Sequence, residues 1–436
     1  PFCYPRSGWP NTDEPASESE GGEGAVTCFQ ATSIYGLIQW YAASGDREAL
    51  DLATRLVRFC MLSKFWGGLV DPKDEYNGAW SHAGKPLPEP VGIAGHEQGH
   101  WFSHFHARAI TLRALLEYAM VMNNERILEF VRRAYEYTMT LAIPRIGWVN
   151  CFPARLNTCE GCALGDMVAL GIRLSDAGAG DYWDDVDAVV RNHMVEQQLV
   201  HADRLAAVAE ASPVRKPEDR SSHQGRESED NVIERTLGNF AALSKPGHIP
   251  KPWVMQCCTA NASRGLYYAW ESTVRERGDS AQVNLLLNRT APGMDMDSCL
   301  PYEGKVVMHN KRLRRVAVRI PSWVSRRALR AQVGAVSRDL RWAGNYLLLD
   351  DLKPGDCIQL DFPVHESTAS YTIAAGLPQA EQTYRCSFRG STLVEISPRS
   401  DDPTAYPLYK RGHLKTNKTP FKQTTRFLTD KTILNW

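Results

Sequence analysis

The sequence lacks a surplus of charge of either sign, because 50 lysines and arginines are balanced by 50 aspartates and glutamates. A balanced chain gives no electrostatic reason to expect a nucleic acid or an anionic membrane as its partner. The sequence also lacks an apolar run long enough to span a bilayer, and its first residues lack a secretory signal pattern. The chain starts with Pro1 rather than Met, which leaves an upstream segment open. We therefore expect no nucleic acid and no membrane partner.

The cysteine spacing of a disulfide-stabilised fold is absent as well. The 11 cysteines are odd in number and scattered along the chain, whereas disulfide frameworks use an even number at close spacing. This pattern favours a reducing compartment, in which thiols serve packing or chemistry. We expect a cytoplasmic protein, and the sequence leaves a homodimer open.

Helical periodicity dominates the first two thirds of the chain. Apolar residues recur at helical spacing in three paired segments, each pair broken by a short polar turn, at 27–64, 104–142 and 160–199. A further helix is predicted at 257–274, and the charged stretch at 205–232 is predicted to be a surface loop. Paired helices of similar length are typical of helical arrays and toroids. We expect residues 1–278 to form this helical domain.

The apolar period changes near residue 279. Short segments rich in Val, Leu and Ile follow at 282–288, 305–310, 314–321, 346–350 and 357–362. In the third of them, Val316, Val318 and Ile320 alternate with more polar positions, as in a half-buried strand. We predict an antiparallel β-sandwich over 279–370 and a C-terminal extension of strands and irregular structure over 371–436. The fold class is then α+β with several domains.

Two cysteine-bearing segments stand at predicted helix starts. One holds Cys159, Glu160 and Cys162, and the other holds the neighbours Cys257 and Cys258. Adjacent cysteines rarely bridge each other, because the closed ring is strained. Three thiols and a carboxylate are a chemically reasonable zinc ligand set, although the spacing is not that of a zinc finger or ribbon. The residues alone leave two alternatives: a metal site, or buried cysteines beside a glutamate that the helix dipole favours.

Taken together, these segments resemble the catalytic signature of the β-L-arabinofuranosidases of glycoside hydrolase family 127. The resemblance rests on Glu160-Gly161-Cys162 and on the later Cys-Cys-x-x-Asn-x-x-Arg at 257–264, and it extends over residues 25–370. It implies an (α/α)6 barrel followed by β-sandwich domains, although fewer helices are visible than a full barrel needs. It also implies that Glu160, Cys162, Cys257 and Cys258 bind one Zn²⁺. Cys257 would be the nucleophile of a retaining glycosidase that releases a terminal furanose from a carbohydrate substrate.

The resemblance leaves the general acid open. In the family a glutamate shortly before the Glu-x-Cys motif protonates the leaving group, whereas residues 143–158 contain no Asp or Glu. Cys151 stands at the matching place, and a thiol cannot replace a tuned carboxylic acid. Glu97 and His100 are our candidates for that role.

A histidine-rich segment at 95–109 precedes the cysteine motifs. If His96, Glu97 and His100 formed the zinc motif of a metalloprotease, a helix would have to carry them. No clear helical pattern surrounds them. We expect His100 and His106 to contact substrate, His106 by resemblance to the family, and Trp148 to stack on a sugar ring. For each of these residues a packing role is the alternative.

Two other functions stay open on the sequence alone. One is a different (α/α)-barrel sugar enzyme that uses paired carboxylates or histidine bases and needs no thiol. The other is a non-catalytic carbohydrate-binding protein in which zinc only holds two helices together.

Overall fold

The computed structural model describes residues 27–61, 105–151, 158–213, 230–373 and 381–422. Two predicted site residues, Glu97 and His100, lie outside these ranges. Among the described helices, none combines the length and the apolar character needed to cross a bilayer.

The three predicted helix pairs are confirmed. The first pair is α1 (Thr27–Ser44) and α2 (Arg47–Cys60), the second is α4 (Phe105–Met122) and α5 (Glu125–Thr140), and the third begins with α6 (Gly161–Asp176). Its second member is one continuous helical run of α7 (Trp183–Ala188), a π-helical turn (Val189–Met194) and α8 (Val195–Gln197). Short polar side chains start α2 and α5, since Asp46 and Asn124 accept hydrogen bonds from backbone N–H groups of the first turn.

The predicted loop at 205–232 is wrong at its start. Residues of this stretch continue α9 (Ala202–Ala211), in which Leu205 and Val208 lie one turn apart and are buried. Their i, i+3 spacing is helical and offsets the low hydrophobicity of the segment. A short helix, α10 (Val232–Thr236), follows the undescribed residues, and α11 (Gln256–Thr273) confirms the predicted cysteine-bearing helix.

Two sheets with a shared apolar core follow α11. One has the strand order β13-β12-β16-β10-β9-β8 and the other β14-β15-β11-β7-β6. Most pairs are antiparallel, but β7 and β11 are parallel. The strands are β6 (Val274–Arg277), β7 (Ser280–Val283), β8 (Arg289–Thr290), β9 (Met294–Ser298), β10 (Lys305–Asn310), β11 (Arg315–Arg319), β12 (Arg330–Val333), β13 (Val336–Ser337), β14 (Arg341–Ala343), β15 (Tyr346–Leu349) and β16 (Cys357–Asp361).

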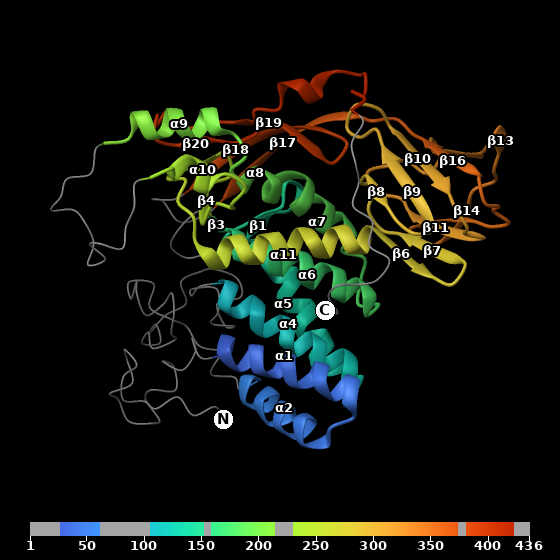
Figure 1. The fold of residues 1–436 in the computed structure, drawn as a ribbon, viewed down its shortest axis with the longest axis horizontal. Coiled ribbons are helices and arrows are strands. Elements are labelled where there is room, and N and C mark those ends of the chain that lie inside the picture. The colour runs from blue at the N-terminus through green and yellow to red at the C-terminus, as the bar shows by residue number, and fades with distance from the viewer. Residues whose placement is uncertain (1–26, 62–104, 152–157, 214–229, 374–380, 423–436) are drawn as a thin grey trace.

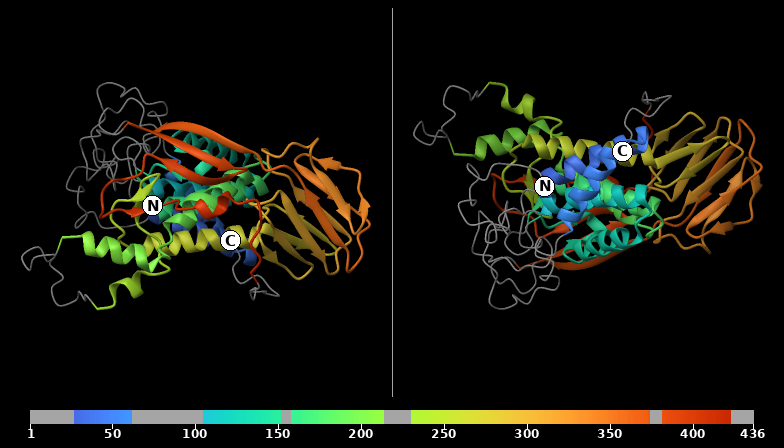
Figure 2. Two further views of the ribbon diagram at one scale, coloured as in Figure 1. Left: turned by 90° about the horizontal axis from the view of Figure 1, so that it is seen from above. Right: turned by 90° about the horizontal axis from the view of Figure 1, so that it is seen from below.

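The last strands return to the helices. An antiparallel sheet of β17 (Glu366–Ile373), β18 (Gln382–Arg389) and β19 (Thr392–Ser397) lies across them, while the two earlier sheets lie at one end of the molecule (Figure 1). Views from above and below give the same arrangement (Figure 2). Tyr384, Phe388 and Leu393 of this sheet share a core with the helices. The chain is therefore an α+β protein with one mixed core and one all-β core.

Short strands complete the mixed core. β1 (Ala142–Ile143) pairs with β2 (Trp148–Val149), and β20 (Tyr406–Pro407) pairs with β5 (His248–Ile249). A third ribbon joins β3 (Cys159–Glu160) to β4 (Leu243–Ser244) and leads directly into α6. This ribbon and the start of α11 carry the cysteine-rich segments.

Candidate metal centre

Glu160 is the residue at which the β3 ribbon turns into α6. Its backbone is extended, with φ −116° and ψ 139°, and it occupies the N-cap position without making a side-chain capping hydrogen bond. Its Oε1 instead lies 3.6 Å from Sγ of Cys258. The dipole of α6 still favours a carboxylate here, but the side chain is directed at the thiols rather than at the helix end.

A close crossing of α6 and α11 brings the two cysteine motifs together. A Cβ atom on Gly165 would lie 2.3 Å from the carbonyl oxygen of Asn261, and one on Gly265 would lie 2.9 Å from Cα of Gly165. Real Cβ atoms do not approach backbone so closely, so the crossing requires glycine at both positions. The first turns are close as well, because a Cβ on Gly161 would lie 3.2 Å from the carbonyl oxygen of Cys258.

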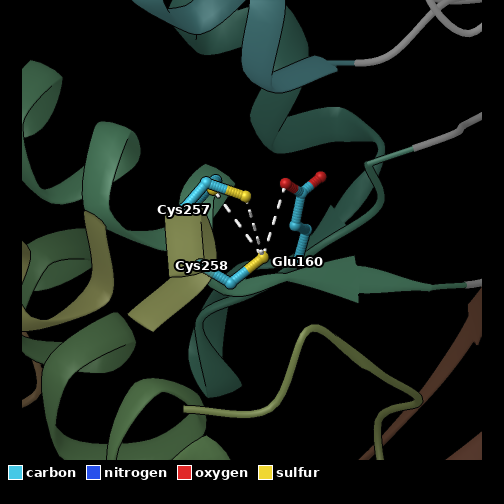
Figure 3. Close-up of side chains that lie close together, drawn as sticks. Glu160, Cys257 and Cys258 are labelled. Carbon is cyan, nitrogen blue, oxygen red and sulfur yellow. Dashed lines mark hydrogen bonds between the residues drawn. The ribbon is translucent and has the colours of Figure 1, made fainter. Parts of the chain in front are cut away.

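Four potential ligands meet at this crossing. Their ligand atoms, from Glu160, Cys162, Cys257 and Cys258, all lie within 4.8 Å of one another. Sγ of Cys258 lies 3.7 Å from Sγ of Cys162 and 4.0 Å from Sγ of Cys257. Figure 3 shows Glu160, Cys257 and Cys258 with their side chains directed toward one another. Three of the four residues are buried, and Cys257 is exposed. This cluster could hold a metal ion.

The three distances from Sγ of Cys258 are close to those expected around tetrahedral zinc. With Zn–S bonds of about 2.3 Å and a Zn–O bond of about 2.1 Å, two thiolates lie about 3.8 Å apart and a thiolate and a carboxylate oxygen about 3.6 Å apart. The distances around Cys258 are 3.7 Å and 4.0 Å to sulfur and 3.6 Å to oxygen. The donor set also suits zinc, which accepts sulfur and carboxylate ligands in sites of four.

The acidities of the thiols follow from their proximity. The hydrogen bond that Cys162 donates to Cys258, together with burial, raises the pKa of Cys162 far above its usual range. Accepting that bond lowers the pKa of Cys258. Burial and the charge of Cys258 raise the pKa of Cys257. A divalent cation at the cluster would change this balance, because coordinated thiols lose their protons.

A polar layer of α11 supports the sulfur atoms. The side-chain amide of Asn261 donates a hydrogen bond to Sγ of Cys162 at 3.2 Å. Arg264, one turn further along α11, donates to the amide oxygen of Asn261. Hydrogen bonds to ligand atoms orient them and tune their basicity. The Asn and Arg of the Cys-Cys-x-x-Asn-x-x-Arg motif are therefore linked to the cluster by consecutive hydrogen bonds, from Arg264 to Asn261 and from Asn261 to Cys162.

A buried ionic group adjoins the cluster on α6. Asp166, one turn after Cys162, is fully buried and lies 2.6 Å from Nδ1 of His106 and 2.9 Å from Nη1 of Arg113. Burial by itself would raise the pKa of Asp166, but the charges and hydrogen bonds of both partners outweigh it and lower the pKa. Burial would lower the pKa of His106, but Asp166 raises it, and Glu160 and Cys258 add to the rise. The negative charges of Glu160 and Cys258 therefore act on His106 as well.

The ribbon behind Glu160 is fixed by a second buried histidine. Nε2 of His193 lies 2.8 Å from Oγ of Ser244 on β4, and Nδ1 lies 2.9 Å from the hydroxyl of Tyr409. Burial, with a smaller contribution from Arg411, lowers the pKa of His193 to about 3. The ring is therefore neutral at neutral pH and connects the C-terminal residues to the ribbon that carries Glu160.

Outside the cluster of four lie two further cysteines, Cys159 and Cys151, and the predicted sugar-stacking residue Trp148. Cys159 and Cys151 are fully buried, and the thiol of Cys151 donates to the carbonyl oxygen of Thr158 at 3.0 Å. Burial raises the pKa of Cys151 well above its usual range, so this thiol is not a proton donor to substrate. Trp148 is also fully buried in the mixed core. An indole with no exposed face packs against protein, and stacking on a sugar would require it to move.

Sequence reasoning missed the supporting residues Asp166, Arg113 and Tyr268. Arg113 donates to the hydroxyl of Tyr268 at 3.3 Å and so connects α4 to α11. One signal was available, because Asp166 is a carboxylate within the otherwise apolar segment ALGDMVALGI, four residues after Cys162. A buried charge at that position needs partners, and it shares a helix face with the cysteine.

The chain was compared with known proteins by sequence and by structure. No protein-family model and no curated sequence matches the chain. A solved structure described as a GH127 β-arabinofuranosidase matches with a TM-score of 0.56 at 15% identity, over 83% of this chain and 55% of that one. The two proteins share a fold. The chain spans about half the length of that relative.

Two further solved structures have lower scores. A GH127 β-L-arabinofuranosidase from Geobacillus stearothermophilus T6 matches with a TM-score of 0.47 at 13% identity, over 87% of this chain and 68% of that one. A structure described as a glycoside hydrolase matches with a TM-score of 0.48 at 12% identity, over 86% of this chain and 61% of that one.

Proposed function

We propose that this chain is a retaining glycoside hydrolase of the β-L-arabinofuranosidase type, with one zinc ion held by Glu160, Cys162, Cys257 and Cys258. The observation that carries the proposal is the cluster itself: four ligand atoms lie within 4.8 Å of one another, and of the four residues only Cys257 is exposed. The fold likeness to a GH127 β-arabinofuranosidase supports the same reading. In this proposal the helices would belong to an (α/α)6 barrel and the two sheets that follow α11 to β-sandwich domains.

The exposed thiol is the proposed nucleophile. A bound zinc ion would keep the cluster thiols deprotonated at neutral pH. Sγ of Cys257 would then attack the anomeric carbon of a terminal furanoside. A C–S bond would form and the C–O bond to the leaving group would break, while the leaving oxygen takes a proton from a general acid, for which Glu97 and His100 are our candidates. Water would subsequently attack the same carbon, returning a proton to that group and releasing the thiolate of Cys257, and the two inversions leave the configuration retained.

The neighbouring residues have positioning roles in this proposal. Asn261 holds Cys162 through its 3.2 Å contact, so that the buried thiol stays in place while Cys257 reacts. His106, fixed by Asp166 at 2.6 Å, presents its ring beside the cluster, where an imidazole can hydrogen-bond a sugar hydroxyl.

The proposal is tested by turnover of nitrophenyl furanosides by protein purified with zinc and a reductant. The β-L-arabinofuranoside should be hydrolysed, and NMR of the first product should show the retained anomer. Cys257→Ser should lower kcat by at least about 10³-fold, because a serine hydroxyl without a base is a poor nucleophile.

The matched control is Cys299→Ser, a thiol outside the cluster with intermediate exposure. It should retain wild-type kcat. A mechanism-based halogenated sugar amide should add its mass to the peptide that carries Cys257 and to no other. Full activity of Cys257→Ser would reject the mechanism. Zinc binding without turnover of any furanoside or pyranoside would instead favour a non-catalytic carbohydrate-binding protein.

A further inference from the structure

A cavity of about 480 Å³ lies on a different part of the mixed core from the cysteine cluster. It is formed where α8 and the start of α9 meet β19 and the segment after β20, and Pro301 closes one side. None of its lining residues belongs to the cysteine cluster or to the residues that contact it.

Positive charge dominates the lining. Arg191, Arg204, Lys410 and Arg411 contribute four positive charges and Glu196 one negative charge, which leaves a net charge of +3 with neutral histidines. The side chains of His201 and His413 add exposed hydrogen-bonding nitrogens at the rim. A concave surface with one sign of charge focuses its field on a ligand of the opposite sign.

Two of the four cations are already neutralised. Arg191 contacts Asp187 at 2.7 Å, and Arg411 contacts Glu196. Arg411 is buried and also donates to the carbonyl oxygen of Leu393 at 3.1 Å. These two arginines therefore hold the walls of the cavity in place.

The other two cations, Arg204 and Lys410, differ in their surroundings. Arg204 donates to the carbonyl oxygen of Pro407 at 3.3 Å, and Lys410 is exposed. Among the described residues, no carboxylate lies within ion-pair distance of either group. They come from segments about 200 residues apart, yet they line the same cavity.

We propose that this cavity binds a phosphate-type oxyanion, either free or carried as an ester on a small sugar. A dianion with oxygens on several sides can contact the guanidinium of Arg204 and the ammonium of Lys410 together. The volume exceeds that of a single ion and leaves room for a small organic body. The site is independent of the proposed glycosidase activity, since it uses other residues.

Isothermal titration of the intact chain tests the site in phosphate-free and sulfate-free buffer. Inorganic phosphate, glucose 1-phosphate and glucuronate are the probes. One phosphate-type ligand should bind per chain, and Arg204→Gln/Lys410→Gln should weaken binding roughly 10- to 100-fold, because each removes a charge-assisted contact.

The matched control is Lys415→Gln. Its Nζ lies 2.7 Å from a carboxylate oxygen of Glu395 and does not line the cavity, so its affinity for phosphate should stay within twofold of wild type. If the double variant does not fold, the single variant Lys410→Gln, at an exposed position, is measured in its place.

The comparison of probes identifies the ligand. Tighter binding of glucose 1-phosphate than of phosphate supports an esterified ligand, and equal binding supports the free ion. The proposal is overturned if neither binds saturably, if the variants bind as wild type does, or if glucuronate binds more tightly than both.

Discussion

The sulfur atoms of Cys162 and Cys258 lie 3.7 Å apart although the two residues are separated by 96 positions in the sequence. Each thiol stands in the first turn of its helix, and the helices are held in contact by glycine at their crossing. The spacing of the ligands is therefore a property of the fold, and any change that separates α6 from α11 should also affect metal binding.

Zinc stoichiometry is the first expected outcome. Elemental analysis of the purified chain should find about one zinc per chain, as one tetrahedral site requires. Cys162→Ser should lower the zinc content and the melting temperature, because metal binding to the folded state stabilises it. A chelator should lower the melting temperature of the wild type, and added zinc should restore it.

Cys159→Ser is the matched control for that variant. Cys159 is also fully buried and lies three residues from Cys162, but it is not one of the four clustered ligands. It should keep a full complement of zinc. Equal zinc loss in both variants would mean that the wrong thiol was assigned, and a metal-free wild type with an unchanged melting temperature would reject the site.

The glycine crossing gives the second expected outcome. Gly165→Ala should lower the free energy of unfolding by about 1–3 kcal/mol, because its Cβ would overlap the backbone of Asn261 and force the helices apart. Zinc affinity should fall with it. Chemical denaturation and a competitive zinc chelator measure the two effects.

Gly36→Ala is the control for helix propensity. Gly36 lies within α1, and a Cβ there would meet nothing within 4 Å. Alanine should leave the free energy of unfolding unchanged or raise it by up to about 1 kcal/mol. If Gly165→Ala behaves in the same way, close helix contact does not position the cluster.

The sequence predicted the long elements for physical reasons that it displays directly, whereas the set of Glu160, Cys162, Cys257 and Cys258 came from the family resemblance. Helices such as α2 and α5 carry a regular apolar face and a polar capping residue. Strands β8, β13 and β14 have two or three residues each, too few to show alternation. These short strands form because longer neighbouring strands supply their hydrogen-bond partners. The pairing is set by the tertiary fold and is not visible in the local sequence.

The supporting residues of the site could not be predicted for a similar reason. Asp166 acquires its role only when α4 places His106 and Arg113 beside it. The sheet of β17, β18 and β19 likewise shares a core with helices more than 200 residues earlier in the chain. Local patterns contain no record of such contacts.

The buried ring of His193 gives the third expected outcome, an acid-dependent loss of stability. Its pKa is about 3 in the folded chain and about 6.5 when unfolded. Because the folded pKa is lowered, the unfolded state binds the proton first as the pH falls. The neutral ring contributes its full stabilisation above about pH 6.5. As the pH falls below that value, the free energy of unfolding decreases by roughly 1.4 kcal/mol per pH unit.

His193→Gln should therefore flatten the dependence of the melting temperature on pH between 7 and 5, although it also lowers stability at pH 7 through lost contacts with Ser244 and Tyr409. The control is His413→Gln, since His413 is exposed, and it should keep the wild-type slope. An unchanged slope in His193→Gln would show that other groups cause the acid sensitivity.

The source of the leaving-group proton gives the last expected outcome. Glu160 belongs to the proposed ligand set, Asp166 is held by His106 and Arg113, and Cys151 is a buried thiol with a raised pKa. None of these groups is suited to donate a proton to a departing alkoxide. Unless Glu97 or His100 supplies the proton, we therefore expect nitrophenyl furanosides, whose leaving group needs no proton, to be hydrolysed much faster than alkyl furanosides.

Glu97→Gln and His100→Gln identify the acid. Loss of a general acid should slow alkyl furanosides by about 10²–10⁴-fold and change nitrophenyl substrates little. Glu125→Gln, which removes an exposed carboxylate from α5, should alter neither rate. If one of the first two variants selectively loses alkyl turnover, that residue is the general acid. If wild type and both variants cleave alkyl and nitrophenyl furanosides at similar rates, the proton comes from another group, and the assignment of Glu97 and His100 is wrong.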